Sequence, residues 1–194
     1  KLRFAAQPFC FAEYVLAQKG ERYTMISASG TDGFYELRQD IGKFYAAASL
    51  AGLCDAVLPE GIVNEELFLR AVNSLKEMCE GDAALALISF FIKLLELSGY
   101  MLDLSACADC GAVLEGKVFF DVAGGCFYCP DCARGAGVSE STLQVLKMCA
   151  GQEYDASLIT ADGKKRALKL LYAYFRQKTD SEVKAIEEYL RMPD

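Results

Sequence analysis

The sequence predicts an α+β fold that is mainly α: a helical bundle with an inserted four-cysteine, zinc-ribbon-like module and a small β segment at the N-terminus. Three observations lead to this prediction. Apolar residues recur at helical spacing through much of the chain, two C-x2-C pairs interrupt the helical segments, and runs with strand-like composition precede them. With 194 residues, the chain can bury a good core as one large domain or two small ones.

Residues 8–28 are predicted to form β structure. Residues 9–16 are rich in aromatic and apolar side chains, Lys19-Gly20 is a turn signal, and residues 23–26 form a second short run. Two strands alone are only marginally stable. This segment is therefore expected to pack on the helices or to belong to a larger β domain.

Residues 35–58 place apolar side chains at helical spacing and are predicted to be helical. A second helix is expected over residues 65–80. Asn64 is its predicted N-cap, its first turn is acidic, and Gly81 follows its end.

The most apolar stretch, residues 83–97, is predicted to be a helix that Asp82 caps and Gly99 terminates. It is shorter than the roughly 20 residues that span a bilayer, and it carries Lys93 and Glu96. Because it is apolar nearly all round, it is expected at the centre of the bundle, and no membrane segment is predicted.

Two C-x2-C pairs, Cys107 with Cys110 and Cys129 with Cys132, give the strongest functional signal. Four thiolates at this spacing can surround one tetrahedral metal at metal–sulfur distances of about 2.3 Å. The chain has no histidine, so a zinc ion here must be held by sulfur, oxygen or backbone groups. One structural zinc bound by these four cysteines is the simplest interpretation.

Cys126 leaves an alternative open, because it forms another C-x2-C with Cys129. Cys132 is the preferred partner of Cys129, since Pro130-Asp131 favours a turn whereas Phe127-Tyr128 favours a strand. A redox C-x-x-C is less favoured, because neither pair opens a helix after a buried strand.

Disulfides are also disfavoured. The chain has nine cysteines, an odd number. Cys10, Cys54, Cys79 and Cys149 lie among apolar residues, where free thiols pack as small hydrophobic groups. Together with the lack of a recognisable signal peptide, this pattern leads us to expect a reducing, cytoplasmic environment.

Inside the cysteine module, residues 118–120 and 126–128 flank Gly124-Gly125 and are predicted to form a short hairpin. Three helices are expected after the module. The first begins with a capping box of Ser141 and Gln144 and runs to Ala150, and the others span residues 164–178 and 181–191, with Asp180 as the N-cap of the last.

The formal net charge of −7 has the wrong sign for a simple nucleic-acid binder. DNA contacts would have to come from a local basic cluster. The candidates are Lys164, Lys165, Arg166 and Lys169, followed by Arg176 and Lys178. A solvated helix face is one interpretation; the other is a site for an acidic peptide tail or a phosphate backbone.

This order of motifs resembles the bacterial recombinational repair family RecO. The similarity rests on Gln7-Pro8-Phe9 before the hairpin, on Leu97-Ser98-Gly99-Tyr100 after the apolar helix, on Gly111 after the first cysteine pair, and on Gly124-Gly125 before the second. The resemblance implies an N-terminal OB-fold, a helical domain and a zinc-binding module. Only the four paired cysteines carry over as functional residues.

Compared with the family pattern, the first residues of this chain are expected to correspond to the last strands of the OB-fold. We therefore expect residues 1–34 to be the C-terminal strands of an OB-fold, residues 35–104 and 136–194 to be the helical domain, and residues 105–135 to be the zinc module.

The resemblance implies a non-enzymatic mediator that binds and anneals single-stranded DNA, works with RecR and engages the acidic tail of single-stranded DNA-binding protein. The alternative is a zinc-ribbon adaptor in transcription or protein assembly, unrelated to repair. An enzyme is disfavoured because the sequence has no histidine base and no Gly-rich phosphate loop, and because four cysteines leave no open metal position.

Overall fold

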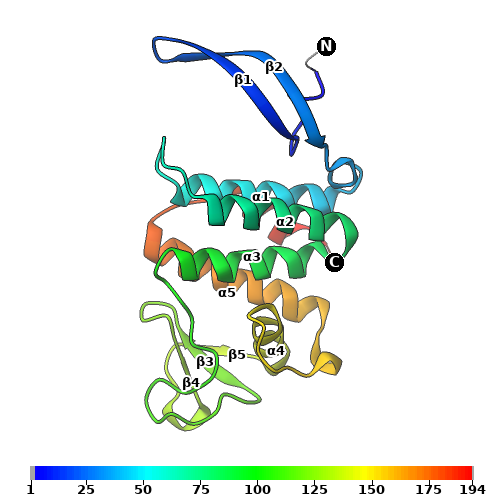
Figure 1. Ribbon diagram of the computed structural model, residues 1–194. Helices are drawn as coiled ribbons and strands as arrows, with labels where there is room; N and C mark the ends of the chain where they lie inside the picture. Colours follow the sequence, from blue (N-terminus) through cyan, green and yellow to red (C-terminus); the bar gives the residue numbers. More distant parts are fainter. Residues whose placement is uncertain (1–2, 194) are drawn as a thin grey trace.

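A layer of helices separates a β-hairpin from a small three-stranded sheet in the computed structural model, which describes residues 3–193 (Figure 1). The predicted fold class, mainly helical with small sheets, is confirmed. The helices are α1 (Ile41–Val57), α2 (Glu65–Glu80), α3 (Ala83–Leu97), α4 (Glu140–Cys149), α5 (Ala161–Thr179) and α6 (Lys184–Arg191). The strands are β1 (Phe11–Lys19), β2 (Arg22–Asp32), β3 (Val118–Asp121), β4 (Cys126–Tyr128) and β5 (Ala136–Val138), and short 3-10 turns cover Tyr35–Arg38, Pro130–Cys132 and Ala156–Leu158.

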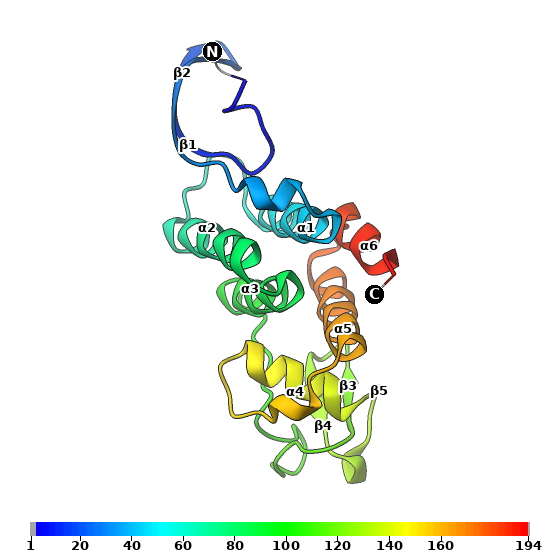
Figure 2. The same cartoon turned by 90° about the vertical axis from the view of Figure 1, so that its right-hand side faces the viewer.

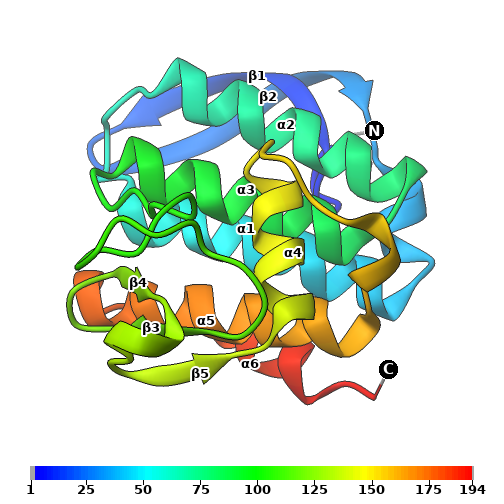
Figure 3. The ribbon, with the colours of Figure 1, turned by 90° about the horizontal axis from the view of Figure 1, so that it is seen from below.

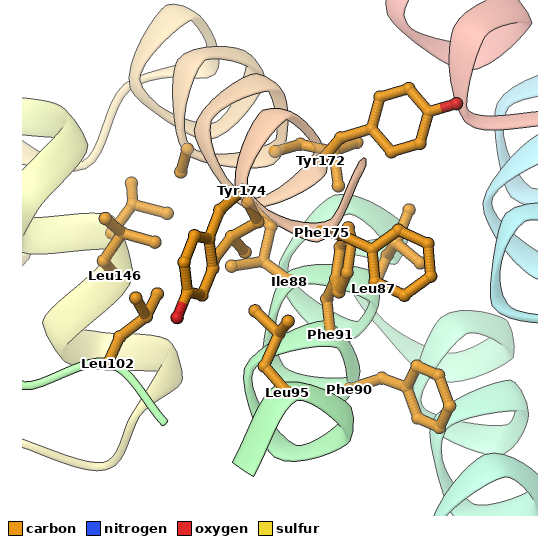
Figure 4. Packing of buried hydrophobic residues seen from close by; sticks show 14 of the residues in the cluster. Leu87, Ile88, Phe90, Phe91, Leu95, Leu102, Leu146, Tyr172, Tyr174 and Phe175 are labelled. Carbon is orange, nitrogen blue, oxygen red and sulfur yellow. The ribbon is translucent and has the colours of Figure 1, made fainter. Parts of the chain in front are cut away.

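Helix α3 is the centre of the bundle, as its composition predicts. It packs against α1, α2, α4 and α5. Its largest side chains are fully buried, and the Phe91 ring meets the edge of Phe175 from α5 at a centroid distance of 5.5 Å (Figure 4). Asp82 caps the helix as expected, because its side chain accepts hydrogen bonds from the backbone amides of Ala84 and Leu85.

Helices α1, α3 and α5 point in the same direction, so their N-termini lie together at one end of the bundle (Figures 1 and 2). Helix α2 runs the opposite way and returns the chain from α1 to α3. The parallel arrangement follows from the connections: α2 links α1 to α3, whereas the cysteine module and α4 link α3 to α5. Among residues 3–193, no helix is both long enough and apolar enough to cross a membrane.

The helical segment predicted over residues 35–58 is divided in the structure. A 3-10 turn, Tyr35–Arg38, precedes α1, and the side chain of Asp40 caps α1 by accepting from the amide of Lys43 at 2.8 Å. The hairpin strands are longer than predicted, and irregularities interrupt their pairing between Phe11 and Ala12 and between Val15 and Leu16.

Two predicted caps are wrong. Ser139, not Ser141, caps α4 by accepting from the amide of Thr142, while the side chain of Gln144 accepts from the amide of Asp155. Asp180 ends α5 in a left-handed conformation instead of starting α6. No side chain among the described residues caps α6; the amide of its N-cap residue Val183 donates to the Tyr172 hydroxyl of α5 at 2.9 Å.

The predicted hairpin of the cysteine module is confirmed, but it belongs to a sheet with a third strand. Strand β3 lies between β4 and β5, and both pairings are antiparallel. The sequence analysis did not identify β5, because Ala136-Gly137-Val138 is too short and too glycine-rich to resemble a strand. Viewed from below, this sheet lies under α5 and beside α4 (Figure 3).

Candidate metal centre

The first cysteine pair lies on a tight loop that closes on itself. The amide of Cys107 donates to Ala112 O at 2.7 Å, and the amide of Gly111 donates to Cys107 O at 2.9 Å. Gly111 has φ +72°, a conformation that glycine adopts without steric cost. This loop places Cys107 in the interior and Cys110 at the surface.

The second pair follows β4 directly. Cys129 is extended, Pro130 begins a 3-10 turn, and the amide of Cys132 donates back to Cys129 O at 3.2 Å. Proline suits this position because its ring presets φ for the turn. The turn brings the side chain of Cys132 to the same side of the chain as that of Cys129.

The structure brings all four predicted sulfurs together. The Sγ atoms of Cys107, Cys110, Cys129 and Cys132 lie within 4.8 Å of one another, and those of Cys110 and Cys129 are 3.7 Å apart. A tetrahedron with metal–sulfur bonds of about 2.3 Å has sulfur–sulfur edges of about 3.8 Å. The four side chains therefore have the spacing of a closed metal site and can hold one ion.

The thiols of the cluster differ in acidity. A hydrogen bond from the backbone of Cys110, followed by one from that of Cys129, lowers the pKa of the Cys107 thiol to about 6. Hydrogen bonding to the sulfurs of Cys110 and Cys129 raises the pKa of Cys132 to about 12. Closely spaced sulfurs resist carrying several negative charges at once, and a bound cation relieves that repulsion.

Cys126 lies outside the group of four, in agreement with the preferred pairing of Cys129. Its sulfur is 3.6 Å from Gly124 O, to which it donates. Burial raises the pKa values of Cys54 and Cys149 to about 11, so these thiols stay protonated and pack as apolar groups.

An ion pair joins the two cysteine loops. Arg134, just after the second pair, contacts the carboxylate of Asp109 at 2.6 Å, and its guanidinium lies 5.3 Å from the centroid of the Tyr128 ring. Because the Arg134 side chain is 62 % exposed, this pair contributes at most about 1 kcal/mol. This ion pair links the first cysteine loop to the segment that follows the second pair.

The six basic candidate residues do not form one patch. Lys164 to Lys169 lie on the first half of α5, whereas Arg176 and Lys178 lie near its other end, about 10 to 21 Å further along the axis at 1.5 Å per helical residue. Arg176 pairs with Glu182 at 2.5 Å, and Lys178 donates to Ala123 O at 2.8 Å. Lys178 thus contacts the turn between β3 and β4 of the cysteine module.

The four basic residues in the first half of α5 are divided between two faces of the helix. Lys164 contacts Asp82 at 2.6 Å, and Lys165 donates to Met192 O at 2.8 Å; both face the bundle end. Arg166 and Lys169 are exposed, and Arg166 pairs with Asp162 one turn earlier.

A cavity of about 380 Å³ lies where the N-termini of α1, α3 and α5 meet. Three lysines contribute to it, together with two aspartates and an apolar floor from α5, α6 and the residues after α6. The lining includes Lys43, Lys164, Lys165, Asp40, Asp82, Leu168, Tyr189, Leu190 and Met192. The sequence analysis missed Lys43 and Tyr189, because only the packing of separate helices brings them to the basic cluster.

Comparison with known proteins shows which family this chain resembles. The family model described as "Recombination protein O C terminal" matches residues 38–186. The chain is 38% identical over 150 residues to the DNA repair protein RecO of Desulforamulus reducens, and the match covers 75% of this chain and 59% of that protein. It is 32% identical over 149 residues to RecO of Pelotomaculum thermopropionicum, with 75% and 58% covered. The match to RecO of a Thermoanaerobacter species is 29% identical and covers 95% of this chain and 79% of the relative. The chain thus spans less than two thirds of the first two relatives.

Proposed function

The chain belongs to the RecO family of DNA repair proteins, and we propose that it acts as a non-enzymatic mediator of recombinational repair in the cytoplasm. In this role it binds and anneals single-stranded DNA and engages RecR and the acidic tail of single-stranded DNA-binding protein. Family membership carries this proposal and favours it over a zinc-ribbon adaptor unrelated to repair. We assign residues 1–34 to the C-terminal strands of an OB-fold, residues 35–104 and 136–194 to the helical domain, and residues 105–135 to the metal module.

The metal in this proposal is one structural zinc held by Cys107, Cys110, Cys129 and Cys132. Thiolate ligands in a tetrahedral set favour zinc, and four protein ligands leave no position for a substrate or water. The absence of histidine from the sequence removes the commonest general acid and base. Both arguments support a binding protein over an enzyme.

The cavity at the bundle end is the proposed site for the acidic tail. Three lysines line it, and the N-termini of three helices point toward it, so both side-chain charge and helix dipoles favour an anionic group. Asp40 and Asp82 offset part of that charge, and Asp82 pairs directly with Lys164, so a bound carboxylate would compete with Asp82 for this lysine. The apolar floor suits an apolar residue of the same peptide.

Single-stranded DNA is assigned to the outer face of α5, where Arg166 and Lys169 are exposed. This assignment separates the basic cluster into an inner pair for peptide and an outer pair for phosphate. The chain's charge of −7 disfavours strong DNA binding, and two phosphate contacts give a shallow salt dependence, with a logarithmic slope of about −1.4 for single-stranded DNA.

The test compares two double variants in binding assays with a labelled acidic tail peptide and a labelled single-stranded oligonucleotide. Lys164→Gln with Lys165→Gln should weaken peptide binding and spare DNA binding. Arg166→Gln with Lys169→Gln should do the reverse and flatten the salt dependence of DNA binding. Equal effects of both variants on both ligands would refute the division, and absence of binding to either ligand would remove the proposed role for this chain.

A further inference from the structure

The turn between β3 and β4 rests on one face of α5. Tyr174 and Lys178 are one helical turn apart and therefore share that face. Lys178 Nζ donates to Ala123 O at 2.8 Å and lies 5.4 Å from the centroid of the Tyr174 ring. The Tyr174 ring meets the edge of Phe120 from β3 at a centroid distance of 5.8 Å.

Tyr174 is 4% exposed and is directed differently from its neighbours on α5. In Figure 4 its ring lies beside Leu102 and Leu146, whereas Phe175 lies next to Phe91 of α3. Tyr174 therefore joins the buried side chains of the module to the core of the bundle. The buried residues of both regions form one continuous apolar cluster.

Contact with the ring requires glycine at position 125. Gly125 has φ +71°, and a Cβ atom there would lie 2.4 Å from the Tyr174 hydroxyl oxygen and 2.6 Å from two ring carbons. The turn is also fixed from within, because the Asp121 side chain accepts from the amides of Ala123 and Gly124, both at 3.1 Å. The turn, held by these internal hydrogen bonds, thus packs against the hydroxyl end of the Tyr174 ring.

Strand β4 connects this contact to both cysteine pairs. Strand β4 leads from Gly125 to Cys129, and Phe127 O in that strand accepts from the amide of Ala108, which lies between Cys107 and Cys110. Any shift of the turn on α5 therefore moves a ligand of the second pair and the backbone of the first.

We propose that Tyr174 and Lys178 are positioning residues for the four-cysteine site: they hold the β3–β4 turn on α5 and thereby keep both cysteine pairs within ligand distance of one ion. This inference rests on the proposed metal site. Outer partners that orient metal ligands typically change metal affinity by about 10- to 100-fold when removed. Loss of the Tyr174 ring should therefore speed the release of metal even though Tyr174 touches no ligand.

The experiment measures transfer of zinc from the loaded chain to an excess of a chromophoric chelator. Tyr174→Ala should release zinc about 10-fold faster than the wild type. Tyr174→Phe should keep the wild-type rate, because it keeps the ring contacts with Phe120 and Gly125. Arg176→Ala is the matched control: Arg176 lies on the same helix, but it is exposed and pairs with Glu182.

A second readout is the visible spectrum of the chain loaded with Co²⁺, which reports the geometry of the four sulfurs. Tyr174→Ala and Lys178→Met should alter the spectrum, whereas the spectrum of Tyr174→Phe should match that of the wild type. If Tyr174→Ala does not fold, Gly125→Ala decides, because it breaks the same contact without changing α5. Gly116→Ala is its control, since Gly116 also has a positive φ (+61°) but a Cβ atom there would meet nothing within 4 Å.

Unchanged zinc release in whichever of Tyr174→Ala and Gly125→Ala remains folded would overturn the inference. So would equal acceleration by Arg176→Ala. A wild-type chain that takes up no zinc would instead refute the proposed metal site itself, and with it any positioning role. The two failures are thus distinguishable.

Discussion

The helical bundle and the cysteine module are ordered by different means. Helices α1, α2, α3 and α5 are 15 to 19 residues long, and each has a side chain that caps its N-terminus. The hairpin strands of the module are only 3 or 4 residues long, and the first cysteine loop is held by a few backbone hydrogen bonds. The bundle buries its own apolar faces, whereas the buried side chains of the short module strands join the apolar cluster of the bundle. We therefore expect substitutions in the two regions to differ in their effects on metal binding and on global stability.

Removal of the metal should separate the two regions most strongly. Cys107→Ser should abolish zinc binding because it removes one of the four ligands. The module should then unfold, since structural zinc contributes roughly 10–16 kcal/mol to the folding of small modules. Hydrogen exchange should then be fast in β3 and β4 and stay slow in α3. Cys126→Ser is the matched control and should bind one zinc like the wild type, because Cys126 lies outside the group of four sulfurs. Zinc loss in Cys126→Ser would contradict the ligand assignment.

A substitution in the bundle core should lower the stability of the bundle and leave zinc binding unchanged. Phe91→Ala removes a fully buried ring that packs on Phe175, so the free energy of unfolding of the bundle should fall by about 3–5 kcal/mol. Denaturant unfolding followed by far-ultraviolet circular dichroism measures this loss. Zinc stoichiometry in the folded chain should stay at one. Leu69→Ala, at a side chain 52% exposed on α2, should change stability by less than about 0.5 kcal/mol.

The smallest expected effect lies at the cap of α3 and depends on pH. Burial raises the pKa of Asp82, but hydrogen bonds from Lys164 and from the Leu85 amide outweigh it and place the pKa below its ordinary value. A carboxyl with a lowered folded-state pKa contributes stability above its unfolded pKa of about 3.9 and loses that contribution as pH falls through the folded value.

Asp82→Ala should therefore cost about 1 kcal/mol at neutral pH and less in acid, as thermal melts at several pH values can show. Asn64→Ala removes the cap of α2, which does not titrate, so its cost of about 1 kcal/mol should be the same across the range. A pH-independent difference for Asp82→Ala would mean that the hydrogen-bonding geometry of this cap matters and its charge does not.

Local features of the fold were predictable because their causes lie within a few residues. Asn64 and Asp82 cap their helices through amides two or three positions away, so the cap and its partner are adjacent in the sequence. The central place of α3 was predictable from its apolar composition alone. The cysteine spacing likewise identified the four sulfurs that the structure brings together.

Features with distant causes were not predictable from the sequence pattern. The Ser141 hydroxyl does not cap α4 because it bonds the hydroxyl of Thr160, 19 positions away, at 2.8 Å, and Ser139 caps the helix instead. The Tyr172 hydroxyl accepts from the amide of Val183 at the start of α6, a contact between residues 11 positions apart. Strand β5 exists because β3 offers it a free edge, not because its own residues favour a strand.

The sequence by itself determined which residues can bind metal, where most helices lie and which helix is central, because thiol chemistry, capping and apolar periodicity act over short distances along the chain. Only the tertiary structure decided that Lys178 contacts the cysteine module and that Lys164 and Lys165 face a cavity while Arg166 and Lys169 face outward. It also decided that Gly125 must lie on Tyr174. These assignments depend on which faces of separate helices and loops meet, and that is fixed by packing across the whole molecule.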